Sequence, residues 1–226
     1  MQKNINFIKT LIGDQVRFSS VIKGNAYGHG IELFVPMAEK AGVKHFSVFS
    51  ADEAFQVISN RQNGAEVMIM GSIDQEELLW AIENEVEVFV FDLGRLENAL
   101  QLAQKHQKLV KIHLHLETGM NRLGLEEHEL LKAIDLLKKY PDCFSLEGVC
   151  THYAGAESIA NYARVKRQIN FYKRRIRLLK RHDVIPKYQH TACSAATIAY
   201  PQTQMEMVRI GILQYGFFPT QETLIH

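Results

Sequence analysis

The segment Ser19-Ser-Val-Ile-Lys-Gly-Asn-Ala-Tyr-Gly-His-Gly30 predicts a strand that ends on a lysine, followed by a tight loop and a helix. The apolar run 16–22 is rich in β-branched residues and precedes Lys23, and a helical pattern begins at Ile31. Ligands of parallel α/β folds bind at the carboxyl ends of the strands, so Lys23 is predicted to lie where a substrate would bind. The neutral amine of a lysine held there can attack a carbonyl carbon and form a Schiff base.

A lysine at a strand end is usually a solvated side chain, so the residues around Lys23 decide its interpretation. Asn25, Tyr27 and His29 alternate with glycine and alanine in a loop too short to pack a core, and we expect them to contact a ligand. From Lys23 onward the segment resembles the lysine motif of the alanine racemase family, Lys-Ala-Asn-Ala-Tyr-Gly-His-Gly, with glycine in place of the first alanine. The resemblance implies that Lys23 holds pyridoxal 5'-phosphate (PLP).

The composition excludes several classes of partner. Of the 226 residues, 46% are hydrophobic and 23% are charged, and the net charge at pH 7 is +1. This balance is ordinary for a globular protein and favours neither a nucleic-acid nor a membrane partner, and no apolar run reaches the roughly 18 residues of a spanning helix. The cysteines Cys143, Cys150 and Cys193 have no paired spacing, which indicates reduced thiols, a cytoplasmic protein and no metal site.

Strand and helix patterns alternate along the chain. The predicted strands are 16–22, 45–49, 65–70, 86–91, 109–116, 144–151, 188–192 and 205–210. Helical patterns begin at Ile31 and then cover 52–61, 75–83, 93–106, 126–140, 158–181 and 194–200. Such alternation predicts an α/β fold with a parallel sheet and right-handed crossovers. Eight units favour a closed (β/α)8 TIM barrel over an open sheet, for which no dinucleotide fingerprint is present.

The resemblance to alanine racemases covers nearly the whole chain but only part of the family's length. Family members carry a further strand before the helix that begins here near Asn4, and a β-domain after the segment that ends here near Pro219. We therefore expect residues 1–226 to be the PLP-binding barrel domain of a two-domain protein that lacks the C-terminal β-domain here. The complete protein is expected to be a homodimer.

The strand at 109–116 carries polar residues on one face. With a period of two, Lys111, His113, His115 and Glu117 point to the same side, which in a barrel is the lumen. Buried imidazoles are costly unless they are hydrogen-bonded or functional, so a structural network in the lumen stays open as an alternative. The following segment resembles the family's Asp-Thr-Gly-Met-x-Arg-Leu-Gly motif, which implies that Arg122 contacts the cofactor's phenolic oxygen and the substrate. His115 stands where many members have a lysine that orients this arginine.

Two further strand ends carry basic side chains. His152 follows the strand at 144–151, in a segment that resembles the family's Thr-His-x-Ala motif, and Arg209 lies at the end of the last strand. A lone histidine at a strand end is usually structural. The resemblance implies that His152 sits beside the cofactor ring in an orienting role and that Arg209 bonds the pyridine nitrogen.

The loops after the last two strands are candidates for a phosphate site, because TIM barrels commonly bind phosphate there. Ser194 begins a helix, and the amides of Gly211 and Ile212 follow the last strand. Simple capping of its own helix is the plain alternative for Ser194. The resemblance implies that Ser194, both amides and Tyr27 hold the phosphate of PLP.

These motifs together imply a PLP-dependent racemase, most specifically one that converts L-alanine to D-alanine for cell-wall peptidoglycan. The catalytic residues would be Lys23, Arg122, His152 and Arg209. In the family, a tyrosine from the second domain of a partner subunit serves the other face of the substrate, so the isolated chain is expected to be inactive or nearly so.

Two other functions stay open at this stage. A single-domain barrel of about this size can carry PLP without catalysis, as in PLP homeostasis proteins, although their lysine loops differ. A barrel isomerase or aldolase could use Lys23 directly on a sugar phosphate. The basic run at 173–182 has apolar residues at helical spacing and is interpreted as the solvated face of a helix.

Overall fold

The structure is a computed structural model that describes residues 1–225. Within them the strands are β1 (Arg17–Val21), β2 (His45–Val48), β3 (Glu66–Ile69), β4 (Glu87–Val90), β5 (Val110–His115), β6 (Phe144–Cys150), β7 (Tyr188–His190) and β8 (Met207–Ile210). The helices are α1 (Gln2–Ile12), α2 (Lys23–Tyr27), α3 (Ile31–Lys40), α4 (Ala51–Asn60), α5 (Gln75–Glu83), α6 (Leu93–His106), α7 (Glu127–Lys139), α8 (Tyr162–Arg181), α9 (Ser194–Ala199) and α10 (Gln221–Ile225). Four short 3-10 helices join them: η1 (Pro141–Cys143), η2 (Ile159–Asn161), η3 (Pro201–Thr203) and η4 (Ile212–Tyr215).

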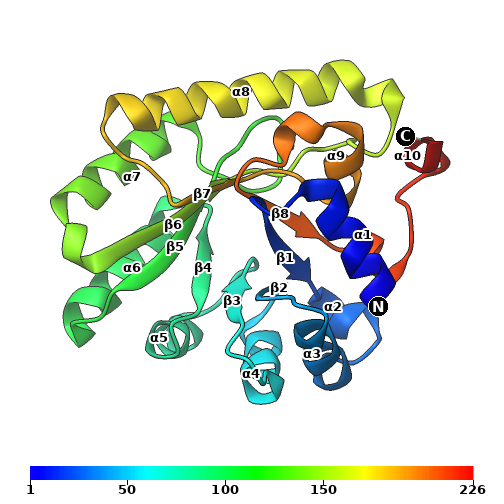
Figure 1. Cartoon of the computed structure of the whole chain (residues 1–226). Helices are drawn as coiled ribbons and strands as arrows, with labels where there is room; N and C mark the ends of the chain where they lie inside the picture. The colour runs from blue at the N-terminus through cyan, green and yellow to red at the C-terminus, as the bar shows by residue number, and fades with distance from the viewer. Residues whose placement is uncertain (226) are drawn as a thin grey trace.

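The strands form one parallel sheet in the order β7-β6-β5-β4-β3-β2-β1-β8, with the helices around it (Figure 1). The first strand pairs with the last, and Ser19 lies opposite Arg209. In the part of the chain that the structure describes, β7 and β8 share no ladder, but the amide of Arg209 donates to the carbonyl oxygen of Ala192 at 2.9 Å, just beyond β7. The sheet is therefore a nearly closed barrel, which confirms the predicted (β/α)8 fold.

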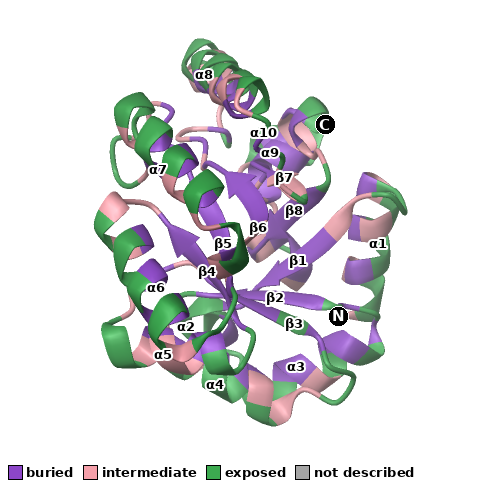
Figure 2. Cartoon of the chain, turned by 90° about the vertical axis from the view of Figure 1, so that its left-hand side faces the viewer, coloured by how far each residue is buried: buried purple, intermediate pink, exposed green. Residues whose placement is uncertain are grey.

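Alternation along each strand separates an outer apolar face from the lumen. On β5, Ile112 and Leu114 are fully buried in the main hydrophobic core, which the strands share with the surrounding helices. His113 and His115 alternate with them and face the lumen, as the period of two predicted. Figure 2 shows the strands buried at the centre of the molecule and the exposed residues on the outer helices. Burying a leucine or isoleucine side chain contributes about 1.5–3 kcal/mol, so each such residue of this shell stabilises the fold.

The helix ends follow local sequence signals. Asp74 forms a capping box with Glu77 at the start of α5, and Ser50 accepts the amide hydrogen of Glu53 at the start of α4. The α7 helix ends at Lys139, before Pro141, because proline cannot continue a helix. These caps place the helices against the strands and leave the loops at the carboxyl ends free to form a site.

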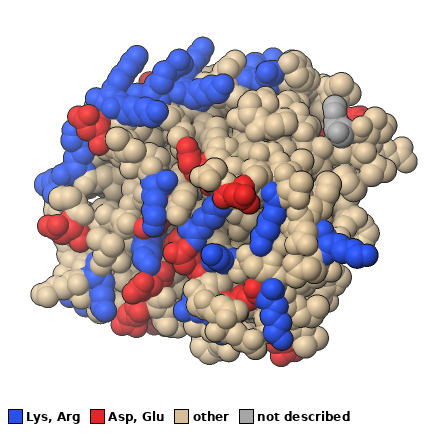
Figure 3. Space-filling view, in the orientation of Figure 1, with Lys and Arg blue, Asp and Glu red and all other residues tan. Residues whose placement is uncertain are grey.

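The long helix predicted at 158–181 is divided in two, because η2 precedes α8. Nine of the 20 residues of α8 are lysine or arginine, none is acidic, and its apolar face is buried. Figure 3 shows these basic side chains along the outer edge of the molecule where α8 lies, which confirms the predicted solvated face. No helix in residues 1–225 has the length and apolar character needed to cross a membrane.

Candidate active site

A cavity of about 540 Å³ opens at the carboxyl ends of the strands. All eight residues predicted for the site line it: Lys23, Tyr27, Arg122, His152, Ser194, Arg209, Gly211 and Ile212. They come from the carboxyl ends of five strands and the loops that follow them, so only the closure of the barrel brings them together. The volume lies within the range of 300–1,000 Å³ that is typical of small-molecule sites.

The segment after Lys23 has an unusual backbone. Gly24, Asn25, Ala26 and Tyr27 all have left-handed conformations, with φ values of 65°, 53°, 56° and 54°. Three of these four residues are not glycine, and each costs roughly 1–2 kcal/mol in this conformation. The sequence predicted a tight loop here but not a left-handed turn.

Hydrogen bonds from outside the turn hold it in place. The amide of Asn25 donates to Oε1 of Glu53 at 3.0 Å, and Oδ1 of Asn25 accepts the amide hydrogen of Ile31 at 2.9 Å. The Tyr27 ring packs against Tyr215, with the ring centroids 5.3 Å apart. Strain of this kind persists where the surroundings over-determine it, and it is concentrated at functional sites. Here the turn carries Tyr27 to the cavity, where its hydroxyl lies beside Gly211.

Ser194, Gly211 and Tyr27 form a cradle of hydroxyl and amide groups. Oγ of Ser194 accepts the amide hydrogens of Gly211 at 3.1 Å and Leu213 at 3.4 Å. It does not cap its own helix, because the N-cap of α9 is Cys193 without a side-chain bond, so the capping alternative is wrong. A Cβ atom on Gly211 would lie 2.5 Å from Oη of Tyr27, so only glycine allows this approach.

The hydroxyl of Tyr27 remains a hydrogen-bond donor over a wide pH range. Burial, and then the nearby Cys193, raise the pKa of Tyr27 above its ordinary value. The cradle therefore offers the hydroxyl donors of Tyr27 and Ser194, which suit a phosphate group.

Arg209 is 6% exposed and held rigidly beside the cavity. Its Nη1 donates to the carbonyl oxygen of His190 at 2.6 Å and to Nδ1 of the same residue, and its Nη2 donates to the carbonyl oxygen of Thr151 at 2.7 Å. The guanidinium carbon lies 5.9 Å from the centroid of the Phe89 ring. A fixed cation, rather than a carboxylate, therefore faces the cavity from β8.

The two histidines that line the cavity are neutral at pH 7. Burial, and then the charge of Arg209, lower the pKa of His152 to about 4 and that of His115 to about 3. Nδ1 of His115 is buried and has no hydrogen-bond partner among the described residues. Neutral imidazoles can orient a neighbouring group by hydrogen bonding, but they cannot act as general acids in the way that a charged imidazolium does.

Arg122 lies on the exposed loop after β5. The Glu117 carboxylate holds this loop by accepting the amide hydrogens of Gly119 and, at 3.0 Å, Asn121. The backbone that carries Arg122 is thus fixed by Glu117, while His115 makes no hydrogen bond to the arginine in the described structure.

Sequence reasoning missed the apolar wall of the cavity. Phe49, Met70, Phe89 and Phe91 line it beside the polar residues. Phe89 and Phe91 follow Glu87 at intervals of two residues, so the side-chain alternation of a strand places all three toward the lumen. That alternation was available in the sequence, but apolar residues in a strand give no signal that separates a cavity wall from a core.

Comparison with known proteins agrees with this geometry. Residues 1–219 match the family described as alanine racemase, N-terminal domain. The chain belongs to this family. It is 32% identical over 224 residues to the alanine racemase of Treponema denticola. The matched region covers 97% of this chain and 58% of that protein. It is also 34% identical over 208 residues to the alanine racemase of Ligilactobacillus salivarius, and this match covers 91% of this chain and 54% of that protein.

Solved structures of alanine racemases have the same fold. The enzyme of Clostridium difficile 630 in complex with cycloserine superposes with a TM-score of 0.89 at 28% identity, covering 97% of this chain and 60% of that one. The Bacillus anthracis enzyme with bound L-Ala-P gives a TM-score of 0.88 at 32% identity, covering 98% and 56%. The chain therefore spans less than two thirds of the length of these alanine racemases.

The residues of this barrel fit PLP, on which the family depends. An amine at Lys23, the hydroxyl groups of Ser194 and Tyr27, and the fixed cation of Arg209 all border one cavity. Gly211 leaves the space that the Tyr27 hydroxyl uses to reach the cradle. An aldehyde, a phosphate and a ring nitrogen need these three kinds of partner.

Proposed function

We propose that this chain is the PLP-binding barrel of a cytoplasmic, homodimeric alanine racemase that supplies D-alanine for the cell wall. The observation that carries the proposal is the cavity, which is lined by one lysine, an anion cradle and a buried arginine. Residues 1–226 would form one domain of a two-domain protein, since relatives extend well beyond the matched region. The substrate would be a small amino acid, and we expect no nucleic-acid or membrane partner.

Each part of the cofactor has a proposed partner in the cavity. Lys23 would hold the aldehyde carbon, and Arg209 would bond the ring nitrogen. The phosphate would bind to Tyr27, Ser194 and the amides of Gly211 and Ile212, where the hydroxyl and amide donors converge.

On the substrate side, Arg122 would contact the phenolic oxygen and the amino acid, and His152 would orient the ring beside Arg209. His152 suits an orienting role because its low pKa, a result of burial and neighbouring positive charge, keeps it neutral.

Bound PLP supplies an electron sink that acidifies the α-hydrogen of an amino acid. Lys23 is the group of this chain that would move that proton, because its amine lines the cavity on one side. Arg209 carries a permanent positive charge and its donors are aligned by His190 and Thr151, so it cannot give a proton to the ring as a carboxylic acid could. That property favours return of the proton to the α-carbon over transfer elsewhere.

Racemisation needs a second proton carrier on the opposite face of the α-carbon. In the family this is a tyrosine from the second domain of a partner subunit. We therefore expect the purified chain to bind PLP and to racemise alanine poorly or not at all. A non-catalytic PLP carrier is the second candidate, and it predicts the same binding without any racemase activity in the complete protein.

Reconstitution with PLP tests the proposal. The purified chain should gain visible absorbance, and borohydride should abolish it by reducing the imine and leave the cofactor covalently attached. Lys23→Ala should not gain this absorbance, and the exposed Lys132→Ala serves as the matched control. Peptide mapping should then find the reduced cofactor on Lys23. A reduced adduct on other lysines only, or none, would refute the proposed role of the cavity. D-alanine formed by the full-length protein, but not by the chain alone, separates the racemase from the carrier.

A further inference from the structure

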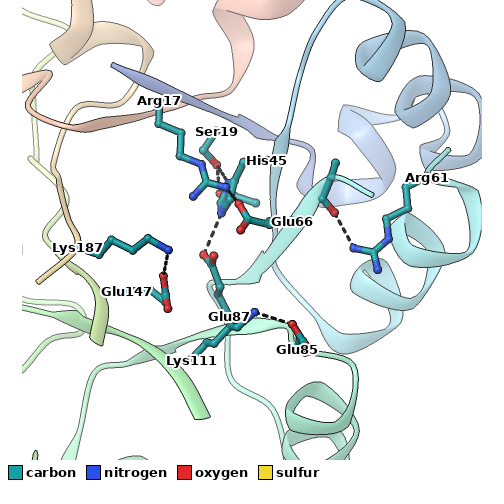
Figure 4. Close-up of polar contacts among 12 residues, drawn as sticks. Arg17, Ser19, His45, Arg61, Glu66, Glu85, Glu87, Lys111, Glu147 and Lys187 are labelled. Atoms are coloured by element: carbon teal, nitrogen blue, oxygen red, sulfur yellow. Dashed lines mark hydrogen bonds and ion pairs between the residues drawn. The ribbon is translucent and has the colours of Figure 1, made fainter. Parts of the chain in front are cut away.

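A continuous line of buried hydrogen bonds runs through the lumen below Arg209. Arg209 Nη1 contacts Nδ1 of His190, and Nε2 of His190 lies 2.8 Å from Nδ1 of His113. Nε2 of His113 lies 2.7 Å from Oε2 of Glu87, and the same oxygen lies 3.0 Å from Nε2 of His45. Figure 4 shows Glu87 pointing into the lumen toward His45. All of these side chains are buried, and His113, His190 and Glu87 are not among the residues that line the cavity at the carboxyl ends of the strands.

Glu87 is the one carboxylate in this line, so it sets the direction of every hydrogen bond. It is 2% exposed. Burial alone raises the pKa of Glu87, but attraction to His45 and the hydrogen bonds from His113 and His45 outweigh burial and lower it below its ordinary value. An ionised carboxylate only accepts hydrogen bonds. His113 and His45 must therefore each carry a proton on Nε2.

The proton positions of the remaining rings follow from Glu87. A neutral imidazole with a proton on Nε2 has a lone pair on Nδ1, so Nδ1 of His113 accepts from Nε2 of His190. His190 then has its own lone pair on Nδ1, which faces the donor Nη1 of Arg209. Burial, and then the charge of Arg209, lower the pKa of His190 well below its ordinary value, so it remains neutral and keeps this lone pair.

The opposite branch is consistent with the same directions. Nδ1 of His45 lies 2.8 Å from Oγ of Ser19, whose hydroxyl can donate to it. Ser19 in turn contacts the hydroxyl of Ser47, which can donate to Ser19. With Glu87 ionised, each imidazole nitrogen of the line thus faces a partner of the opposite kind.

We propose that Glu87 is a positioning residue: its carboxylate fixes the tautomers of His113 and His190, so that an acceptor faces Arg209 and holds the guanidinium at the cavity. The line also places one negative charge in the lumen to accompany the buried positive charge of Arg209. The tautomers are a property of the chain without cofactor. Only the consequence for PLP binding rests on the proposed function.

Replacing the Glu87 carboxylate separates its two properties, which are its negative charge and its ability to accept hydrogen bonds. In Glu87→Gln the amide oxygen can still accept from both imidazoles, so the tautomers should stay as in the wild type. In Glu87→Met there is no acceptor, and a proton on Nε2 of His113 would be buried without a partner. His113 should then move its proton to Nδ1 and donate to Nε2 of His190. That change forces the proton of His190 onto Nδ1, opposite the Nη1 donor of Arg209.

Long-range ¹H–¹⁵N spectra of histidine-labelled protein without cofactor measure these tautomers directly, because protonated and unprotonated ring nitrogens have well-separated ¹⁵N shifts. We expect Nε2-protonated His113 and His190 in the wild type and Glu87→Gln, and a Nδ1-protonated His190 in Glu87→Met. A wild-type His190 protonated on Nδ1, or an unchanged His190 in Glu87→Met, would overturn the proposal. If Glu87→Met does not fold, His113→Leu cuts the same line while leaving the pair between Glu87 and His45, and His190 should lose its single tautomer.

PLP titration then measures the consequence at the cavity. Glu87→Met should weaken PLP binding about tenfold, equivalent to ~1.4 kcal/mol, while Glu87→Gln stays within about twofold of the wild type. Equal affinity for all three proteins, together with changed tautomers in Glu87→Met, would overturn the positioning role. Failure of the wild type to bind PLP would instead count against the proposed function, and the spectra would still decide the tautomers.

Discussion

Gly148→Ala is the sharpest test of how the lumen is packed. Gly148 lies on β6 opposite His113 on β5, where the register of the two strands shifts. A Cβ atom there would lie 2.7 Å from Nε2 of His190 and closer still to Nδ1 of His113. The position therefore requires glycine for space, since the backbone at this residue is not in the left-handed region.

The expected loss of stability combines two effects. Forcing an extra methyl group into a packed interior costs about 1–3 kcal/mol. The methyl group also pushes apart the hydrogen bond of 2.8 Å between His113 and His190, and leaving a buried polar group without a partner costs about 1–3 kcal/mol. Gly148→Ala should therefore lower the free energy of unfolding by about 2–6 kcal/mol.

Urea denaturation followed by circular dichroism measures this loss as a lower midpoint at an unchanged slope. Gly94→Ala is the matched control, because it makes the same chemical change near the start of α6, where the nearest atom to the new Cβ is Oδ1 of Asp92 at 3.3 Å. Alanine favours a helix over glycine by up to about 1 kcal/mol, so the control should change stability by no more than that. A loss below about 1 kcal/mol for Gly148→Ala would refute the packing argument. The rings of His113 and His190 would then be able to move away from the new methyl group at little cost.

Two further predictions concern stability. The pKa of His152 is about 4 in the folded chain and ordinarily about 6.5, so its contribution is present above pH 6.5 and is lost as the pH falls toward 4, with a full size of about 3 kcal/mol. His152→Gln should therefore flatten the dependence of the urea midpoint on pH between 6.5 and 4, and an equally steep dependence would contradict the assignment. Asp74→Ala removes the capping box of α5 and should cost about 1 kcal/mol by thermal or urea unfolding, whereas the exposed Asp135→Ala should have almost no effect, and equal losses would argue against the cap.

The line from Glu87 to Arg209 also bears on an alternative left open by the sequence. Polar residues on the lumen face of β5 could have belonged to the site or to a structural network. The structure divides them, because His115 lines the cavity and His113 lies below it in the hydrogen-bonded line. Lys111 lies at the other end of the strand and pairs with Glu85 at 2.9 Å.

Several features followed from the sequence because they depend on neighbouring residues. Alternation of strand and helix patterns predicted the barrel, since each strand–helix unit buries its apolar face only against the next one. The lysine at the end of β1 and the motifs around Arg122, His152, Ser194 and Arg209 predicted which side chains would meet, because the carboxyl ends of parallel strands share one edge.

Other features depended on contacts between residues far apart in the chain, which no local pattern encodes. The left-handed turn after Lys23 is held in part by Glu53, on α4, which accepts a hydrogen bond from its backbone. Ser194 accepts hydrogen bonds from the amides of Gly211 and Leu213 instead of capping its own helix, because closure of the barrel brings η4 next to it. The sequence alone determined the barrel and the chemistry of its site residues, through periodicity and residue type. Only the tertiary structure decided which hydrogen bonds hold them, because donors and acceptors from different strands meet only once the barrel has closed.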